Sequence, residues 1–362
     1  MMRLLEFYNP YPDCVLLHLE TTIAPANEPF DLYLNLRFGE QWQSLLDGRI
    51  KFALKGGKLK LKLEGGEFSS VSCDLGEQFP VATTTSQTDP MWHFLPKPSD
   101  FLLQGVVGTV KLGTIAPTAK SYCLAATFEI SRSDLSLTDA EGLWRHDISP
   151  NKHGILERAI ALLLRETCFA PYLCWMQLGA IDDSDWQPLV KENEAKLSQD
   201  LLSLVKQTIE RIYESPTDNF LELAVLAGLN PLTDLAGGNF LAANLSGSDL
   251  NGANLSRTNF RGANLTDADL SEANLSYARL SGADLSGAYL GNANLSHADL
   301  HRSSLALANA IAADFTGADL REANLSNTNL SGATVGQARF GNNTGLSEEM
   351  KLSLSDRGAT VE

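Results

Sequence analysis

A strict five-residue spacing of large apolar side chains runs through the last third of the chain. From Leu235 to Phe340, every fifth residue is large and apolar except Ala310, and no insertion shifts the register. The residue two positions earlier is always small, as with Ala243 before Leu245. An α-helix repeats every 3.6 residues and a strand every two, so this spacing fits neither. A strict short period instead predicts a solenoid, whose coils stack only on their neighbours.

The typical repeat reads Ala-Asn-Leu-Ser-Gly, as in residues 243–247. We expect the leucine and the small residue to point inward, because the other three positions are polar. This pattern resembles the pentapeptide-repeat family over residues 233–342, and the stretch from Phe220 into the first repeats resembles members common in cyanobacteria. The resemblance implies a right-handed quadrilateral β-helix with four repeats per coil. The N-terminal region suggests no family.

The inward positions should form the core of the solenoid. The predicted core residues include Phe240, Leu245, Leu250, Phe260, Leu285, Phe315 and Phe340. Ala310 should leave a gap in this column, so we expect Ile311 or Leu307 to turn partly inward, or a local bulge.

Four repeats per coil would place residues 20 apart on top of each other. One face then carries nearly all the basic residues of the repeats, and its candidate interaction residues are Arg261, Arg279, His301, Arg302, Arg321 and Arg339. Two interpretations stay open. The face is either a ladder of ion pairs, such as Arg279–Asp299 and Asp319–Arg339, or a docking surface. Guanidinium groups would suit carboxylates or phosphates there.

Composition limits the possible partners and location. The chain has a net charge of −16 and no basic cluster, which argues against direct nucleic-acid binding. Five irregularly spaced cysteines fit reduced thiols better than disulfides or a zinc site. The longest apolar run, residues 159–164, is too short to span a membrane, and no signal peptide is evident. We therefore expect a cytoplasmic protein that meets membranes only peripherally.

Four regions are predicted along the chain. Residues 1–145 form a mostly β, sandwich- or barrel-like domain, with alternating strands at 30–38 and 58–63. Residues 146–230 form a helical segment, with helices near 153–168, 188–214 and 218–228, the last capped by Asp218. The β-helix occupies 231–342, and a second cap helix from Ser347 lies in 343–362. A helix over each end would block edge-to-edge association.

No catalytic motif, cofactor site or metal site is predicted. His297 and His301 should fall on different sides of a coil corner, and no nucleophile motif appears. The favoured function is therefore non-catalytic: a scaffold for protein–protein interaction, with a partner that the sequence does not identify. One alternative is a DNA-mimic regulator of DNA gyrase, as in a subset of the family. Nine acidic and six basic residues in 235–342 give the rod only −3, which disfavours it. The other alternative is a β domain that is enzymatic or binds a small molecule or glycan.

Overall fold

The computed structural model describes two compact units. The described residues are 3–23, 28–72, 81–84, 89–97, 100–145, 147–180 and 198–362. The first unit comprises residues 1–141 and 163–201, and the second comprises 142–162 and 202–362.

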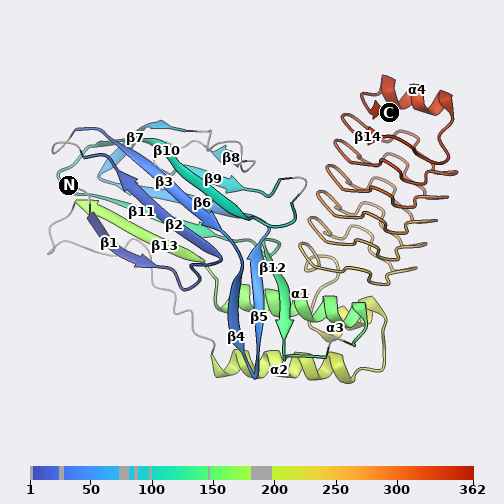
Figure 1. The fold of residues 1–362 in the computed structure, drawn as a ribbon, viewed down its shortest axis with the longest axis horizontal. Helices are drawn as coiled ribbons and strands as arrows, with labels where there is room; N and C mark the ends of the chain where they lie inside the picture. The colour runs from blue at the N-terminus through green and yellow to red at the C-terminus, as the bar shows by residue number, and fades with distance from the viewer. Residues whose placement is uncertain are drawn as a thin grey trace. The chain divides into compact units, whose positions relative to one another are not determined.

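The first unit is built from antiparallel sheets, as the sequence predicted for this region (Figure 1). A six-stranded sheet has the order β1-β13-β11-β6-β9-β8, with bounds Arg3–Tyr8, Cys174–Ala180, Tyr122–Glu129, Gly57–Glu64, Met91–Phe94 and Val81–Thr84. A four-stranded sheet has the order β2-β3-β10-β7, with bounds Val15–Thr21, Phe30–Phe38, Gly105–Pro117 and Gly66–Val71. A three-stranded sheet has the order β12-β5-β4, with bounds Leu135–Glu141, Gly48–Leu54 and Gln41–Leu45.

Alternating side chains explain how these strands bury one face. Strand β6 buries Leu59, Leu61 and Leu63, while the lysines between them are more exposed. Rings from different sheets meet in the interior. The Phe38 ring of β3 lies 5.7 Å from that of Phe94 and 5.6 Å from that of Phe128. These contacts hold the four-stranded and six-stranded sheets together through buried apolar area.

Strand β13 corrects the expectation that residues 146–230 form a helical segment. It pairs antiparallel with both β1 and β11, so it is an inner strand of the six-stranded sheet. Its residues are buried on both faces up to Gly179. A strand that is buried on both faces shows no alternation, and a short apolar run does not separate such a strand from a helix.

Four helices are described: α1 is Pro150–Thr167, α2 is Gln199–Glu214, α3 is Phe220–Leu226 and α4 is Glu348–Asp356. The predicted start of α2, from 188 to 197, lies outside the described residues. The prediction that Asp218 caps α3 was wrong. Asn219 caps this helix, accepting a hydrogen bond from the Glu222 N–H. The prediction for α4 is confirmed, because Ser347 accepts from the Met350 N–H. No helix in the described ranges is long and apolar enough to cross a membrane.

The repeats form coils of 20 residues each. Parallel bridges join residues 20 apart throughout, beginning with Asn239–Asn259 and ending with Asn324–Thr344. Leu245 N–H, for example, donates to Asn264 O at 2.8 Å, and Asn264 N–H donates to Ala243 O at 2.9 Å. Each coil therefore contains four five-residue repeats and satisfies its backbone by pairing with the coils above and below. Figure 1 shows these coils as a stack of loops coloured from yellow to red.

Two features of the repeat turn the chain at each corner. The Asn or Asp before the inward leucine folds back on the backbone, as when Asn244 Oδ1 accepts from Ser246 N–H at 3.2 Å. This is the Asx turn. The second residue after the inward position has a positive φ in every repeat from 237 to 342, whether it is Gly or not. Glycine recurs there because it adopts this conformation without steric cost.

Replacing Gly252 with alanine is expected to destabilise the second unit by about 1 kcal/mol. Gly252 has φ +65°, and nothing lies within 4 Å of an added Cβ, so the cost is backbone strain alone. Gly336 also has open space but no positive φ, which makes Gly336→Ala the matched control. Amide hydrogen exchange of the coils measures both. Equal effects of the two variants would contradict the assignment of strain to position 252.

The inward residues form a continuous column, with one irregularity. Phe240, Leu245, Leu250, Phe260, Leu285, Phe315 and Phe340 are each at most 1% exposed. The expected response at Ala310 was wrong. Leu307 and Ile311 point outward, with 67% and 43% of their surface exposed. Ala310 N–H still donates to Asn329 O at 2.9 Å, so the coil register continues without a bulge.

Helices cover both ends of the column. The Phe220 ring of α3 meets the Phe240 ring edge-on at 5.0 Å. At the other end, strand β15 (Thr360–Val361) follows α4 and pairs in parallel with β14 (Arg339–Phe340). Helix α1 also covers the first coil, which the sequence did not predict. Its buried Asn151 accepts from Asn244 N–H at 2.7 Å and donates to Asn244 O at 3.0 Å. These contacts occupy backbone groups that an open coil would expose.

Candidate functional site

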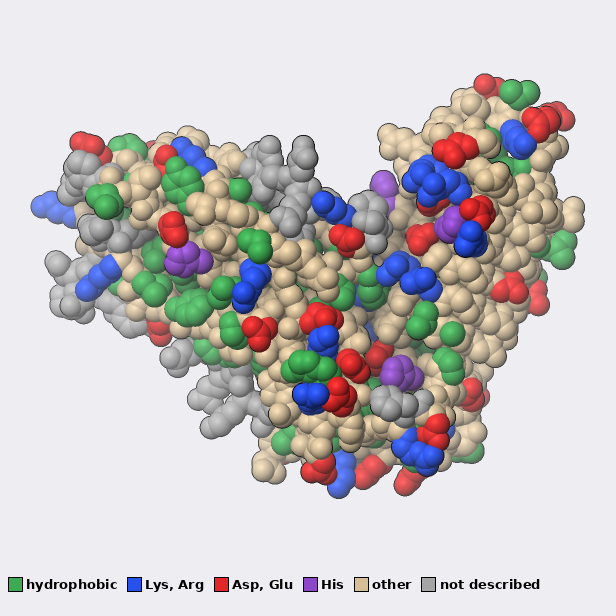
Figure 2. Space-filling view, viewed as in Figure 1, with side chains coloured by type: hydrophobic (Ala, Val, Ile, Leu, Met, Phe, Trp, Pro, Cys, Tyr) green, Lys and Arg blue, Asp and Glu red, His purple; other side chains and the backbone are tan. Residues whose placement is uncertain are grey.

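We call residues 258–262, 278–282, 298–302, 318–322 and 338–342 the arginine face. Parallel bridges stack its central column in the order Asn259, Arg279, Asp299, Asp319 and Arg339. Every candidate interaction residue named above lies in these stretches. The coil geometry thus brings together residues up to 78 positions apart in the sequence, from Arg261 to Arg339. Figure 2 shows acidic and basic side chains side by side on the face of the coils that is turned to the viewer.

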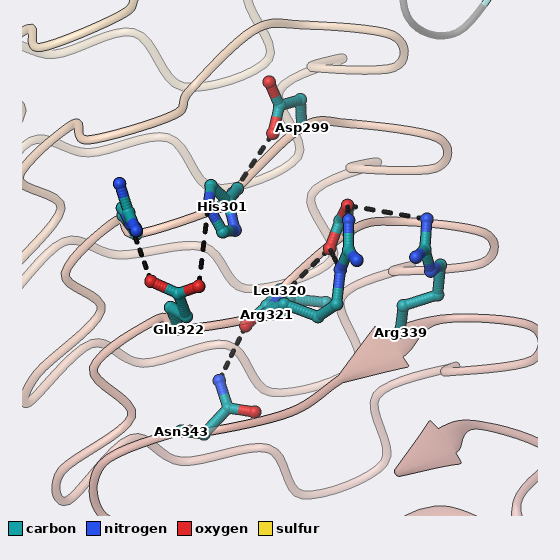
Figure 3. A network of polar contacts seen from close by, with 9 residues as sticks. Asp299, His301, Leu320, Arg321, Glu322, Arg339 and Asn343 are labelled. Carbon is teal, nitrogen blue, oxygen red and sulfur yellow. Dashed lines mark hydrogen bonds and ion pairs between the residues drawn. The ribbon is translucent and has the colours of Figure 1, made fainter. Parts of the chain in front are cut away.

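Asp319 holds two arginines at the C-terminal end of this face (Figure 3). Arg321 binds its carboxylate with two prongs, Nε to Oδ1 at 2.8 Å and Nη2 to Oδ2 at 2.5 Å. Arg339 Nη1 from the next coil lies 3.7 Å from Asp319 Oδ2. Asp319 Oδ1 also accepts from the Arg321 N–H at 3.2 Å, so the same carboxylate forms the corner turn.

Glu322 forms a second group with residues of the coil before it (Figure 3). Arg302 Nε donates to Glu322 Oε2 at 2.6 Å across one coil step. His301 Nε2 lies 3.9 Å from Glu322 Oε1, a distance that adds charge attraction only when the ring is protonated. Arg302, Arg321 and Arg339 are thus all engaged by acids of the same face.

The arginines keep these carboxylates ionised. Burial pushes the pKa of Asp319 upward, but the hydrogen bonds and charge of Arg321, together with Arg339, outweigh it and leave this pKa below its usual value. The hydrogen bond from Arg302 lowers the pKa of Glu322 in the same way. Exposed ion pairs of this kind contribute little to stability, because water and salt screen them. The network therefore fixes side-chain positions more than it stabilises the fold.

Replacing Arg321 with glutamine is expected to raise the pKa of Asp319, because its two-pronged donor is lost while burial remains. A lowered folded pKa means that the stabilisation is present above the unfolded value of about 3.9 and is lost as the pH falls through the folded value. Carboxyl-detected NMR titration of Asp319 measures the shift. Arg261→Gln is the control, since Arg261 lies away from this carboxylate. An unchanged Asp319 titration in Arg321→Gln would contradict the assigned cause.

The N-terminal end of the face differs from this neutralised end. Arg261 is exposed, and no ion pair involving it occurs among the described residues. Arg279 lies beside Asp299 in the stacked column. Asp299 Oδ1 accepts from the His301 N–H at 3.2 Å, which fixes that corner. Positive charge on this face is therefore most accessible near Arg261.

The sequence did not foresee that the acids of this face also form turns. Asp299 and Asp319 occupy the position before the inward leucine, where Asn is the most frequent residue and Asp the next. Their place at the same repeat position as Asn could have indicated this turn, because Asn and Asp both favour Asx turns. Within the described ranges, no group of His, Cys, Asp and Glu side chains is arranged to hold a metal ion.

A family model described as pentapeptide repeats matches the chain in eight copies, over residues 239–276, 263–302, 278–310 and 303–342. A pentapeptide repeat protein from the Arabidopsis thaliana thylakoid lumen is 32% identical, over 33% of this chain and 78% of that one, with a TM-score of 0.24. Rfr23, a pentapeptide repeat protein from the cyanobacterium Cyanothece 51142, is 40% identical over 22% of this chain and 58% of that one, with a TM-score of 0.18. QnrB1, a plasmid-mediated fluoroquinolone resistance protein, is 20% identical over 34% of this chain and 81% of that one, with a TM-score of 0.17. No curated protein matches the sequence.

Proposed function

Because the chain belongs to the pentapeptide-repeat family, we propose that it is a non-catalytic scaffold whose arginine face docks another protein. The observation that supports this most is the fixed, outward display of arginines on stacked coils. Backbone pairing between coils and a buried leucine column hold the face in one shape. A surface that is already ordered loses little conformational entropy when a partner binds.

The partner of this face should present carboxylates. Guanidinium groups bind carboxylates through paired hydrogen bonds, and the Arg321–Asp319 pair is an internal example of that geometry. Arg302, Arg321 and Arg339 already have acidic neighbours, so a partner must compete for them. Arg261 needs no such exchange. We therefore propose Arg261 as the point where an acidic partner segment first binds.

Charge reversal at Arg261 tests this function. Arg261→Glu should lower the capture of the partner from a lysate of the native host at least tenfold, measured by quantitative mass spectrometry against the wild-type chain. Ser246→Glu is the matched control, because Ser246 is exposed at the same repeat position on a different side of the coil. Equal loss with both variants, or no loss with Arg261→Glu, would contradict docking at this face. Reversing Arg321 is less informative, since a new Glu would face Asp319 and disturb the network.

We expect no inhibition of DNA gyrase in a supercoiling assay at micromolar protein. Imitation of DNA requires a dense row of negative charges. The arginine face instead carries Arg261, Arg279, Arg302, Arg321 and Arg339. Inhibition that survives a buffer of about 0.15 M salt would contradict the scaffold proposal and restore DNA mimicry as the alternative.

Three finer features belong to the same proposal. The coils are right-handed and quadrilateral, the first unit is a sandwich- or barrel-like domain, and the protein acts in the cytoplasm. Support for the last is that Cys14, Cys123, Cys168 and Cys174 are free and buried, which suits a reducing compartment. Cys73 lies outside the described residues.

A further inference from the structure

A second surface of the solenoid departs from the polar pattern of the repeats. We call residues 248–252, 268–272, 288–292, 308–312 and 328–332, together with the adjoining corner residues 267 and 307, the tyrosine face. It lies two sides along the coil from the arginine face. Tyr289, Leu307 and Ile311 are 53%, 67% and 43% exposed there. Outward positions elsewhere in the repeats are mostly Asn, Asp, Ser, Thr and Gly.

Tyr289, Leu307 and Ile311 lie on two successive coils of this face, and we call them the apolar patch. Tyr289 stacks directly below Asn309 through a parallel bridge, and Leu307 and Ile311 flank Asn309 on either side. Gly287 and Gly291 flank Tyr289 in turn, so no side chain shields the ring within its own coil side. The backbone beneath is regular, since Ile311 N–H donates to Asn309 Oδ1 at 3.4 Å.

The same repeat that exposes large side chains buries a small one. Ala310 replaces the inward leucine between the outward Leu307 and Ile311. Because the coil does not bulge there, core packing does not explain the two outward side chains. Leu307 and Ile311 are therefore surface residues of the tyrosine face and do not fill the space beside Ala310.

Acidic residues line the coil next to the patch. Asp269 lies directly below Tyr289 in the stacked column, and Glu272 lies three residues further along. Asp267 leans over the next coil, because a Cβ built at Gly287 would lie 2.2 Å from its Oδ1. Hydrogen bonds from Ser271 hold the pKa of Asp269 below its usual value, so this carboxylate stays ionised at neutral pH. Asp249 extends the acidic column by one more coil, and the tyrosine face has no Lys or Arg.

We propose that the tyrosine face binds a basic amphipathic helix of a partner protein. The apolar side of the helix would cover Tyr289, Leu307 and Ile311, and its Lys or Arg residues would pair with Asp249, Asp269 and Glu272. Apolar burial supplies the affinity of such a helix-in-groove or helix-on-face contact. Charge complementarity determines that the bound helix is basic and in which direction it runs along the rod.

The length of the helix follows from the coil spacing. Asp249 and Asn309 are three coil steps apart, which corresponds to about 14 Å at the strand spacing. A helix rises about 1.5 Å per residue, so about ten residues, nearly three turns, would span the acidic and apolar parts.

A peptide probe tests this surface in the full chain. The probe is a fluorescent 14-residue amphipathic helix of leucine and lysine, and its binding is followed by fluorescence anisotropy. We expect Leu307→Ser/Ile311→Ser to weaken binding at least tenfold, while Val225→Ser/Leu352→Ser, which changes exposed apolar residues elsewhere, leaves it unchanged. A leucine–glutamate peptide of the same length should not bind.

A second pair of variants tests whether the probe binds the acidic residues of the tyrosine face or responds only to the net negative charge of the chain. Asp249→Asn/Asp269→Asn keeps the Asx turns, because asparagine retains the accepting oxygen. We expect this double variant to weaken binding of the leucine–lysine probe about tenfold and to make that binding depend less on salt concentration. Asp284→Asn/Asp314→Asn removes the same charge from other sides of the coil and should have no effect.

Three outcomes would overturn the proposal. The first is equal binding of the leucine–glutamate peptide, and the second is equal weakening by both aspartate pairs. The third is concentration-dependent dimerisation of the wild-type chain that Leu307→Ser/Ile311→Ser abolishes, which would make a second copy the occupant. Failure here leaves the proposed function intact, because Arg261 and the arginine face lie on another side of the coil.

Discussion

Replacing Phe260 with alanine is expected to lower the free energy of unfolding of the second unit by about 3–5 kcal/mol. Phe260 is fully buried, and its ring lies 5.5 Å from that of Phe240, which in turn meets Phe220 of α3. The substitution therefore leaves a cavity at the junction between the cap and the first coils. In a stacked repeat the loss also weakens the interface with the neighbouring coil.

Hydrogen exchange of the amides between residues 255 and 265 measures this loss locally. A local readout is needed because a chain of two compact units does not unfold in one two-state step. Leu241→Ala is the control. Leu241 is 54% exposed in the repeat stacked one coil before that of Phe260, so its removal should cost less than about 0.5 kcal/mol. Similar costs for the two variants would contradict a solenoid whose stability resides in the inward column.

Removing residues 346–362 is expected to make the protein associate end to end. The tail continues the coil pairing, since Thr360 N–H donates to Ala338 O at 2.8 Å and Glu362 N–H donates to Phe340 O at 2.9 Å. Gln337 N–H likewise donates to Gly358 O at 2.8 Å. Without the tail these groups form an open edge, which readily pairs with another chain.

Sedimentation velocity over a range of concentrations measures the association. Thr360→Pro removes one donor to the last coil while keeping α4, so it should produce a weaker form of the same effect. Leu352→Ser changes an exposed position on α4 and should sediment as the full chain does. If the truncated protein sediments unchanged at every concentration, the tail is not a protective cap.

The solenoid was predictable because the residue type at each position of the repeat is explained by its role within that repeat. The inward leucine and alanine, the Asx turn and the residue with positive φ recur in one five-residue unit, so a single repeat specifies the coil. The arginine face followed once the coil length was set at 20 residues. The pairing on that face did not follow fully, because the two-pronged Arg321–Asp319 contact depends on side-chain rotamers rather than on register.

The missed features depend on contacts between distant segments. Strand β13 is buried between two strands that lie far from it in the sequence, so its apolar run had no periodicity to reveal it. The role of α1 depends on Asn151 meeting Asn244, 93 residues away. At Ala310 the expectation assumed that core packing controls the outward residues. The regular hydrogen bonding of the coil shows that the backbone does.

Site-specific photocrosslinking tests the central proposal, docking at the arginine face, most directly. A photoreactive amino acid is placed at position 261 or, in a matched chain, at position 246, and each is irradiated in a lysate of the native host. Scaffold function through the arginine face predicts a discrete protein adduct from position 261 and none from position 246. Adducts of the same protein from both positions, or from neither while the first unit alone retains the partner, would contradict it.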